Sequence, residues 1–524
     1  MNVTFKVVDL FAGPGGLAEG FSSVRNEDGQ RAFDIHLSIE KEASALRTLR
    51  LRSFFRQFLT PPSDYYDYVA GKISHDELVE RHPGEWACAV AETRLLELGS
   101  ERAQQELDPI LDELRNSNEP TILIGGPPCQ AYSLVGRARN KGIKGYEAAK
   151  DNRHFLYQEY IRIIGKLQPA AFVMENVKGI LSSKVGQTAI FEQVLIDLRA
   201  AGGSPDSYCL IPVVRPAESE ASSFIVRCEQ FGIPQARHRV IIIGIRKDLA
   251  CGLSDINRAG LVPISYVKTT VWDVLEGMPE LRSGLSRDSD TPERWRETAS
   301  DAMLAAANAC MANQLPEVAS VLRTAAQEVK IIARLLGRKS TDLGRTRKNN
   351  VLAAWLSDPQ LTTLLNHETR GHMREDLARY AFAAAFAEVF ERSPKASEFP
   401  EGLAPRHGNW KSGKFADRFR VQLWKRPSTT VTSHISKDGH YFIHPDLKQC
   451  RSLTVREAAR LQTFPDNYLF EGNRTEQFVQ VGNAVPPLMA RQVAKALLSL
   501  LVNLRDVTRD QVLPKSEAFT QLPA

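Results

Sequence analysis

The alternation of short apolar runs with longer helical segments up to about residue 250 most constrains the fold of this chain. The apolar runs are continuous, which is typical of strands buried on both faces of a parallel sheet. Helical segments lie between them, as in proteins whose sheet is covered by helices. We therefore predict an α/β fold with a mostly parallel sheet and ligand sites at the carboxyl ends of its strands. The expected strands are 5–11, 34–40, 121–126, 170–177, 224–228 and 239–245, and the expected helices include 42–57, 155–167 and 189–199.

Residues 51–118 are too many for a simple connection between the second and third of these strands. Their charged amphipathic sequence favours helices at 89–99 and 101–115. We predict a mostly helical insertion that contains one further strand, whose position the sequence does not give.

The sequence changes in character after residue 250. Two alanine-rich segments with helical periodicity, 298–335 and 374–392, flank a basic stretch at 338–350. Residues 401–426 carry seven Lys or Arg against two Asp or Glu, and aromatic residues are interleaved with them: Trp410, Phe415, Phe419 and Trp424. These features predict a second, smaller and partly helical domain. We place the domains at 1–250 and 251–475, followed by a C-terminal segment at 476–505 and a polar, poorly ordered tail at 506–524.

Composition limits the compartment and the partners. The net charge of +5 permits a nucleic-acid partner if the positive charge lies on one face. The seven cysteines are scattered and form no C-x-x-C pair, so we expect neither a disulfide framework nor a metal site. No apolar run approaches the ~20 residues that would cross a bilayer. We therefore expect a soluble protein of a reducing cytoplasm, without a membrane partner.

A glycine-rich turn, AGPGG at 12–16, joins the first strand to a helix that begins near Leu17. Glycine permits positive φ and lets the backbone approach a ligand closely. Glu40 ends the next strand, where a carboxylate can accept hydrogen bonds from ribose hydroxyls or simply be solvated. Because the spacing is not G-x-G-x-x-G, S-adenosylmethionine fits this turn better than a dinucleotide.

Cys129 follows a buried strand that ends in Gly-Gly-Pro-Pro. A lone cysteine is most often a small core residue, but Pro127 and Pro128 hold this one rigidly at the ligand edge. We predict that it is a nucleophile. The loop at 131–146 mixes glycine with Arg and Lys, and it either closes over a polyanion or is an ordinary solvated loop.

Two other strand ends carry charged residues that suit the same site. Glu175 ends an apolar strand, where a carboxylate can hold or deliver a proton. Arg237 and Arg239 alternate with His238 at the start of a later strand, so both arginines are expected to point to one side.

Taken together, these segments resemble the DNA (cytosine-5) methyltransferase family. The motifs occur in the order that the family shows, which a chance match would not produce. The resemblance covers residues 5–57, 121–250 and 425–500, and leaves the middle region to a variable target-recognition domain. The motifs are DLFAGPGG, GGPPCQAYS, MENV, QARHRV, RSLTVREAARLQTFPDNY and QVGNAVPPLMARQVAKAL.

The resemblance implies an S-adenosylmethionine-dependent methyltransferase fold and a mechanism without a metal. The target cytosine is flipped out of the duplex, and the thiolate of Cys129 attacks carbon 6. Glu175 is similar in position to the carboxylate that holds or protonates N3. Arg239 would bind the cytosine O2, supported by Arg237.

The resemblance also implies which residues hold S-adenosylmethionine, and it implies that the C-terminal helix packs beside residues 9–21. One family element, the acidic residue after the third strand that meets the adenine, is not identified within 51–118. The residues that match cofactor positions are Phe11, Pro14, Gly16, Glu40, Pro128, Leu156, Asn483 and Val485.

Residues 452–464 read as an amphipathic helix capped by Ser452 or Thr454. We expect Arg456 and Glu457 to be structural and to pair with each other. Residues 401–426 and 428–434 are candidates for phosphate or base contacts.

The resemblance implies double-stranded DNA as the partner of a monomeric, bacterial-type modification enzyme. It allows for a cognate restriction endonuclease that acts separately. A transfer-RNA cytosine-5 methyltransferase would lack the long region at 251–450 and differ at Gln130. A catalytically silent relative would lack Cys129, Glu175 or Arg239, and a small-molecule methyltransferase would have no use for the basic loop.

Overall fold

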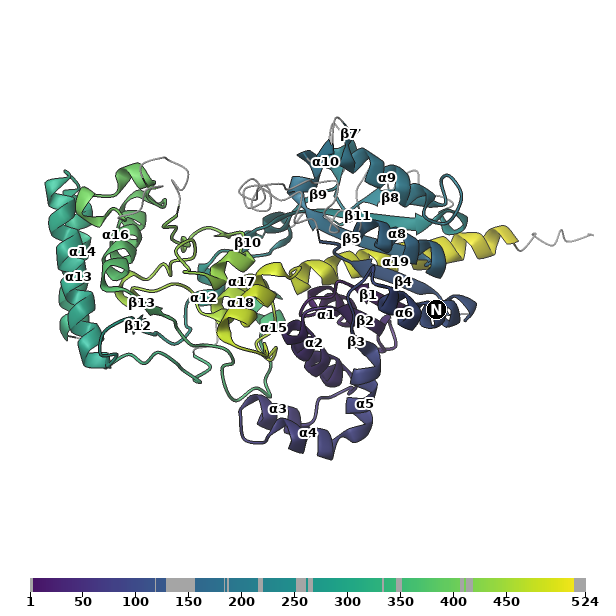
Figure 1. Cartoon of the computed structure of the whole chain (residues 1–524), viewed down its shortest axis with the longest axis horizontal. Coiled ribbons are helices and arrows are strands. Elements are labelled where there is room, and N and C mark those ends of the chain that lie inside the picture. Colours follow the sequence, from purple (N-terminus) through teal and green to yellow (C-terminus); the bar gives the residue numbers. More distant parts are fainter. Residues whose placement is uncertain are drawn as a thin grey trace, which may run out of the picture.

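The chain folds into two lobes that lie side by side, each with its own buried core. The larger lobe is built on the central sheet, and the smaller, mainly helical lobe lies at the left of Figure 1. The structure is a computed structural model. It describes residues 3–117, 119–128, 156–182, 184–185, 188–214, 220–250, 261–262, 267–331, 334–344, 351–405, 410 and 418–512.

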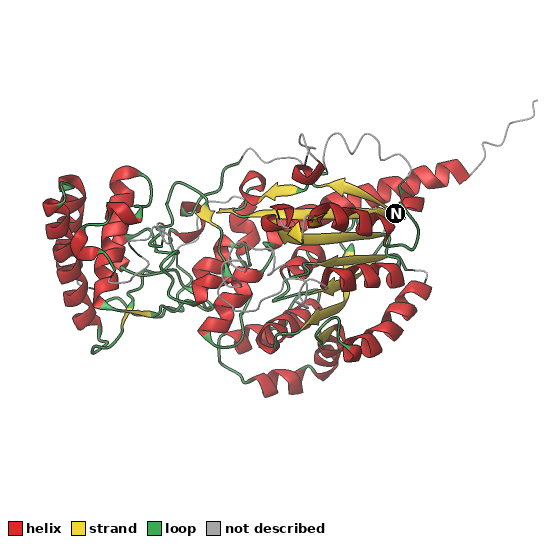
Figure 2. Ribbon diagram, turned by 45° about the horizontal axis from the view of Figure 1, so that its top comes forward, coloured by secondary structure: helices red, strands yellow, loops and turns green. Residues whose placement is uncertain are grey.

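The central sheet has the strand order β3-β2-β1-β4-β5-β11-β8, and β9 also pairs with β11. The first five of these strands run parallel, whereas β11 runs antiparallel to β5, β8 and β9. Figure 2 shows this sheet with helices on both sides, which confirms the predicted mostly parallel α/β fold. The strands are β1 (Phe5–Leu10), β2 (Phe33–Glu40), β3 (Thr93–Leu95), β4 (Thr121–Gly125), β5 (Ala171–Val177), β8 (Tyr208–Pro212), β9 (Ile225–Arg227) and β11 (His238–Arg246).

Successive residues of each strand enter opposite cores, which explains why the apolar runs are continuous. Val7 and Ile243 lie in the core on one face, together with residues of α1 (Gly16–Ser22) and α19 (Pro487–Val512). Val8 and Ile242 lie in the core on the other face. The helices of that second face are α6 (Glu101–Asn116), α8 (Leu156–Leu167) and α9 (Ile190–Ala200).

The insertion after β2 forms the protrusion at the bottom of Figure 1. Its hidden strand is β3, which pairs in parallel with β2 at the edge of the sheet. The predicted helix over 89–99 is wrong beyond Glu92, because the backbone from Thr93 onward forms this edge ladder instead. The helices here are α2 (Ala43–Arg56), α3 (Ser63–Val69), α4 (His75–Arg81) and α5 (Pro83–Glu92).

Three alanine-rich helices form the core of the smaller lobe: α13 (Pro292–Ala312), α14 (Pro316–Ile331) and α16 (Arg374–Phe390). Small side chains such as Ala306, Ala326 and Ala381 are buried where these helices meet. The alanine-rich stretch at 298–335 is two helices, since Gln314 adopts a positive φ of 58° and Pro316 starts the second helix.

The C-terminal part returns to the larger lobe through α17 (Val455–Leu461), α18 (Arg474–Asn483) and α19. Because α19 extends to Val512, the tail predicted from residue 506 is wrong as far as that residue. Among the described residues, Arg474–Val502 is long and apolar enough to cross a membrane, but 61% of its most apolar window is buried inside the molecule. This segment, which covers α18 and the first part of α19, therefore packs into the core of the protein. The remaining short elements are β6 (Lys184–Val185), β7 (Thr188–Ala189), α10 (Glu220–Ser223), β10 (Gln235–Ala236), α12 (Trp272–Leu275), β12 (Gly284–Leu285), α15 (Val351–Leu356), β13 (Gly371–His372) and β14 (Ser428–Thr429).

Candidate active site

The carboxyl ends of β1, β2, β4 and β5 meet at one edge of the sheet, as parallel neighbours must. The predicted site residues that the structure describes come to this edge from those strands, from the start of β11 and from the turn between α18 and α19. Cys129 and the basic loop at 131–146 lie outside the described residues.

The turn between β1 and α1 contains residues with positive φ, and residues from the C-terminal part of the chain contact it. Phe11, Gly13 and Gly15 have positive φ values of 56°, 58° and 96°. The carbonyl of Pro14 accepts a hydrogen bond from the hydroxyl of Tyr468. A Cβ on Gly16 would overlap the carbonyl oxygen of Val485. The implied packing of the C-terminal helix beside this turn is therefore observed.

Glu40 is buried beside the same turn. Its carboxylate accepts hydrogen bonds from the backbone N–H groups of Gly13 (2.7 Å), Lys41 (2.9 Å) and Glu42 (2.8 Å). Burial raises the pKa of Glu40, and these three hydrogen bonds oppose the rise. A carboxylate offers about four acceptor positions, so capacity remains for a ligand hydroxyl.

Asp9, at the end of β1, is fully buried beneath the turn. Both of its carboxyl oxygens are without a hydrogen-bond partner among the described residues. Burial raises the pKa of Asp9 well above its usual value, and the positive charge of Arg56 opposes the rise. Two buried carboxyl oxygens without hydrogen-bond partners, at the end of β1, are compatible with a site for a polar, cationic cofactor such as S-adenosylmethionine.

Glu97 is an acidic residue that follows β3, the strand whose position the sequence did not give. It follows the strand by two residues and its side chain is 72% exposed, with Oε1 3.8 Å from Nζ of Lys41. Gly99 lies close to the side chain of Leu156, the first residue of α8, because a Cβ on Gly99 would be 3.7 Å from it.

The turn between α18 and α19 lies beside the glycine turn at 12–16. Asn483 is the last residue of α18 and its side chain is exposed. Val485 is buried, and its carbonyl packs against Gly16. The turn thus brings an exposed amide side chain beside the glycine turn.

The strand end that leads to Cys129 is fastened to β5. The side-chain amide of Asn176 donates to the carbonyl of Pro127 at 3.2 Å. Pro127 is buried and Pro128 is half-buried. The segment before Cys129 is therefore fixed by hydrogen bonding as well as by its two prolines.

Glu175 and Arg239 form an ion pair at the edge, with Nε of Arg239 2.7 Å from Oε1 of Glu175. Each side chain is only 12% exposed. The other carboxylate oxygen faces Gly126, at the end of β4, where a Cβ would lie 3.0 Å from it. The paired carboxylate and guanidinium thus lie beside Gly126, which precedes Cys129 by three residues in the sequence.

Arg237 lies deeper than Arg239 and is 1% exposed. Its guanidinium donates to the carbonyls of Val431 (2.7 Å) and Gly482 (3.2 Å). Its hydrogen bonds are therefore made to the protein's own backbone.

Several aromatic residues predicted to contact DNA are part of the smaller lobe's core. Phe419 is 2% exposed, and Trp410 packs against the same cluster. Trp424 packs edge-on against Trp272, with ring centroids 5.2 Å apart. The prediction of base contacts is wrong for Phe419, because its ring fills the lobe interior, and Phe415 lies outside the described residues.

The predicted pair between Arg456 and Glu457 is also wrong. Glu457 pairs with Arg451, both side chains being 1% exposed. Arg456 donates to the carbonyls of Leu365, Pro465 and Tyr468. Thr454 caps the helix in a capping box with Glu457, and the helix is shorter than predicted.

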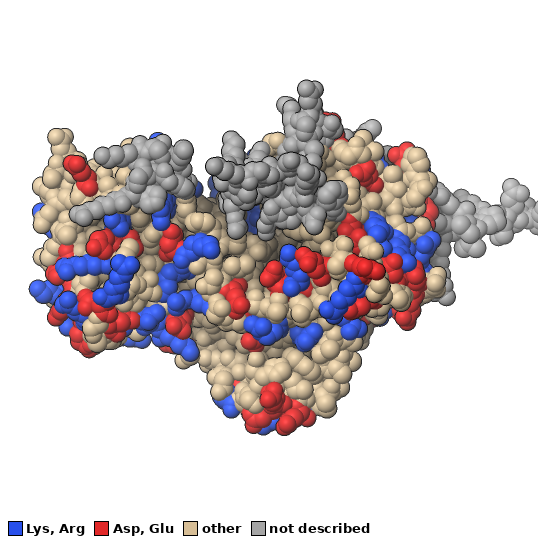
Figure 3. Space-filling model, viewed as in Figure 1, with Lys and Arg blue, Asp and Glu red and all other residues tan. Residues whose placement is uncertain are grey.

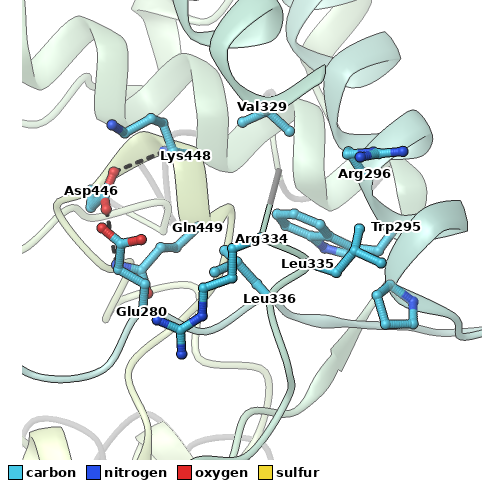
Figure 4. Close-up of a pocket in the computed structure, with 11 residues that line it drawn as sticks. Glu280, Trp295, Arg296, Val329, Arg334, Leu335, Leu336, Asp446, Lys448 and Gln449 are labelled. Atoms are coloured by element: carbon cyan, nitrogen blue, oxygen red, sulfur yellow. Dashed lines mark hydrogen bonds between the residues drawn. The ribbon is translucent and has the colours of Figure 1, made fainter. Parts of the chain in front are cut away.

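Two cavities lie away from this edge of the sheet. The larger, of about 340 Å³, lies at the amino ends of β1 and β4, beside Glu119, Thr121 and Arg246. On the face shown in Figure 3, Lys and Arg side chains alternate with Asp and Glu over both lobes. The smaller lobe has a cavity of about 20 Å³, with room for about one water molecule. Figure 4 shows Trp295, Val329 and Leu335 among the residues that line it. Among the described residues, His, Cys, Asp and Glu form no cluster that could hold a metal ion.

Comparisons with known proteins agree with this arrangement. Residues 100–499 match the family described as C-5 cytosine-specific DNA methylase. The chain belongs to this family. It is 34% identical to the type II methyltransferase M.Bpa9945I of Bacillus paralicheniformis over 94% of this chain and 99% of that protein. It is 26% identical to the type II methyltransferase M.AgeI of Thalassovita gelatinovora, again over 94% of this chain and 99% of that protein.

This C-5 cytosine-specific DNA methylase is therefore an enzyme, a DNA (cytosine-5-)-methyltransferase. Its fold also matches the crystal structure of a prophage-encoded protein of E. coli, with a TM-score of 0.53 and 18% identity. The match covers 95% of this chain and 100% of that one. The matched family range includes β4, β5, β11 and the turn between α18 and α19, which together supply the strand-end groups described above.

Proposed function

We propose that this methyltransferase acts on cytosine within a specific DNA sequence, by flipping the base out and forming a covalent bond between Cys129 and carbon 6. The observation that carries the proposal is the ion pair between Glu175 and Arg239 beside the end of β4. A base that reaches Cys129 would meet a carboxylate and a guanidinium at once.

Each residue has a defined task in this proposal. The Cys129 thiolate adds to carbon 6, and the displaced electron pair makes carbon 5 nucleophilic. Glu175 holds a proton at N3 and Arg239 donates to O2, so both stabilise the charge that develops on the ring. After carbon 5 has taken the methyl group, loss of its proton expels the thiolate and restores the aromatic ring.

S-adenosylmethionine is the methyl donor that we propose, and when bound it supplies an electrophilic methyl group. Glu40 would accept from the ribose hydroxyls with its remaining acceptor positions, and Glu97 would face the adenine beside Leu156. Asn483 would contact the methionine end. The other residues proposed to line this site are Phe11, Pro14, Gly16, Pro128 and Val485.

The biological setting follows from the relatives' names. Both relatives are called type II methyltransferases, so we propose a bacterial modification enzyme that acts on double-stranded DNA in the cytoplasm as a monomer. A cognate restriction endonuclease would act separately. The domain limits predicted from the sequence, with target recognition in 251–475, are retained in this proposal.

The test is covalent trapping. Bisulfite sequencing of DNA from cells that express the protein first gives the methylated sequence. A duplex with 5-fluorocytosine at that cytosine should then form a complex that resists denaturation, because fluorine cannot leave carbon 5 as a proton does.

Cys129→Ala should abolish both trapping and methyl transfer while cofactor binding stays within a few-fold. Cys88→Ala, at an exposed free cysteine, is the matched control and should trap normally. Turnover by Cys129→Ala would contradict the mechanism, and trapping on fluorinated RNA but not on DNA would assign the enzyme to transfer RNA.

A further inference from the structure

Arg237 is a buried cation that takes no direct part in the chemical steps of the proposed mechanism. Its guanidinium contacts two carbonyls, and no carboxylate among the described residues lies within ion-pair distance. Burial, and to a smaller extent the charge of Arg239, lower the pKa of Arg237 to about 9. A buried charge without an opposite charge is unfavourable unless its hydrogen bonds compensate, so the two carbonyls that Arg237 contacts decide what it does.

Two glutamines complete a polar hub around Arg237, and both are 0% exposed. Gln235 accepts from the N–H of Val431 at 2.8 Å and donates to the side chain of Gln462 at 3.0 Å. Gln462 in turn donates to the carbonyls of Val481 (2.6 Å) and Ala484 (3.3 Å). The hub of Gln235, Arg237 and Gln462 thus joins two segments that are far apart in the sequence.

The first of these segments, Ser428–Ser433, leads out of the smaller lobe. Its strand β14 pairs in parallel with β10, which contains Gln235. The hydroxyl of Thr430 donates to the carbonyl of Ala236 at 2.6 Å. This segment is therefore docked on the residues directly before Arg239.

The second segment, residues 481–484, is the turn that brings Asn483 to the proposed cofactor site, and we call it the cofactor turn. Gly482 lies in backbone contact with Thr432 and Ser433, where a Cβ would overlap the main chain of both. The two segments therefore touch each other, and Arg237 bonds a carbonyl from each.

We propose that Arg237 is a positioning residue. It fixes the segment 428–433 of the smaller lobe and the turn at 481–484 to β11, the strand that carries Arg239, so that binding of DNA and binding of cofactor strengthen each other. The inference rests on the proposed function, since it needs both ligands at this edge. Coupling of this kind is reciprocal, so DNA tightens cofactor binding by the factor by which cofactor tightens DNA binding.

The full-length enzyme and Arg237→Lys provide the test. The dissociation constant of S-adenosylhomocysteine is measured by equilibrium dialysis, with and without saturating plasmid DNA that the wild type methylates. For the wild type, DNA should lower that constant by about five-fold or more. Arg237→Lys keeps the positive charge but loses the planar guanidinium that donates to two carbonyls at once. For this variant, DNA should lower the dissociation constant of S-adenosylhomocysteine by less than about two-fold.

Arg456→Lys is the matched control. Arg456 is also fully buried and donates to main-chain carbonyls, but these belong to Leu365, Pro465 and Tyr468, outside the hub. The Arg456→Lys variant should lose about as much thermal stability as Arg237→Lys, but it should keep the coupling between DNA binding and cofactor binding. Gln462→Met, which removes the hub's bonds to the cofactor turn, replaces Arg237→Lys if that variant does not fold.

Two results would overturn the inference: a wild type in which DNA does not change cofactor affinity, or coupling in Arg237→Lys equal to that in Arg456→Lys. A wild type that binds neither S-adenosylhomocysteine nor DNA would instead overturn the proposed function.

Discussion

Gly16 and Val485 meet in direct backbone contact, with no space for even a methyl group between them. They are separated by most of the chain, yet one begins α1 and the other precedes α19. Gly20, one turn further along α1, is in similar contact with Ala490. The glycine turn at 12–16 is therefore shaped as much by the C-terminal helix as by its own glycines.

Gly16→Ala should push α19 away from the turn and weaken cofactor binding. Overpacking of this kind costs about 1–3 kcal/mol of unfolding free energy, and we expect the dissociation constant of S-adenosylhomocysteine to rise in parallel. Gly84→Ala is the control, because nothing lies within 4 Å of a Cβ there. Equal effects of the two substitutions, measured by urea unfolding and equilibrium dialysis, would show that the contact is unimportant.

Glu175→Gln should remove catalysis while leaving the cofactor site intact. It abolishes the ion pair with Arg239 and the proton at cytosine N3, and a positioned acid or base contributes about 100-fold or more to the rate. Single-turnover methyl transfer measures this loss. Glu229→Gln breaks the neighbouring pair with His238, 2.8 Å apart, and should change the rate by less than about two-fold. A rate for Glu175→Gln near that of the control would exclude the proposed role.

The sequence predicted those parts of the fold that repeat a single physical pattern. Strands β4, β5 and β11 are continuous apolar runs because both of their faces are buried, and the site residues follow from where such strands end. The hidden strand β3 was not located, since it has only three residues at a sheet edge and follows a helix directly.

The sequence could not predict which aromatic and charged residues after residue 400 are buried. Phe419 sits in a basic stretch, but a ring serves equally well in a core and against a base, so composition cannot separate the two. Arg456 and Glu457 are adjacent on a helix and therefore point in different directions. The true partner of Glu457 is Arg451, on the chain before the helix, and only the three-dimensional fold shows it.

Glu19→Gln should destabilise the larger lobe strongly. Glu19 on α1 pairs with Arg52 on α2 through two hydrogen bonds of 2.8 and 2.6 Å, with side chains 8% and 5% exposed. Removing one partner leaves a buried charge, at a cost of about 3–5 kcal/mol. Glu106→Gln, in the exposed pair with Arg102, should cost no more than about 0.5 kcal/mol. Chemical denaturation of the two variants compares these values directly, and similar losses would mean that the buried pair contributes nothing special.

The smaller lobe should lose stability in mild acid because it buries histidines in their neutral form. Backbone N–H groups of Ser452 and Asp446 donate to ring nitrogens of His372 and His444, which only an unprotonated nitrogen can accept. Burial lowers the pKa of His444 and of His367 to about 4, and it lowers the pKa of His372 well below its usual value.

The unfolded chain binds these protons near the ordinary histidine pKa of about 6.5, whereas the folded protein binds them only at lower pH, near pH 4 for His367 and His444. Stability is therefore complete above about pH 6.5 and falls as the pH drops from there toward 4, by roughly 1–2 kcal/mol per histidine at pH 5. Thermal unfolding followed by tryptophan fluorescence at pH 7.5 and 5.0 measures the loss. His367→Gln should reduce the difference between the two pH values by about one histidine's share, while His75→Gln, at a half-exposed histidine of α4, should leave it unchanged. A midpoint that does not move between these pH values would show that the buried histidines are not neutral in the folded lobe.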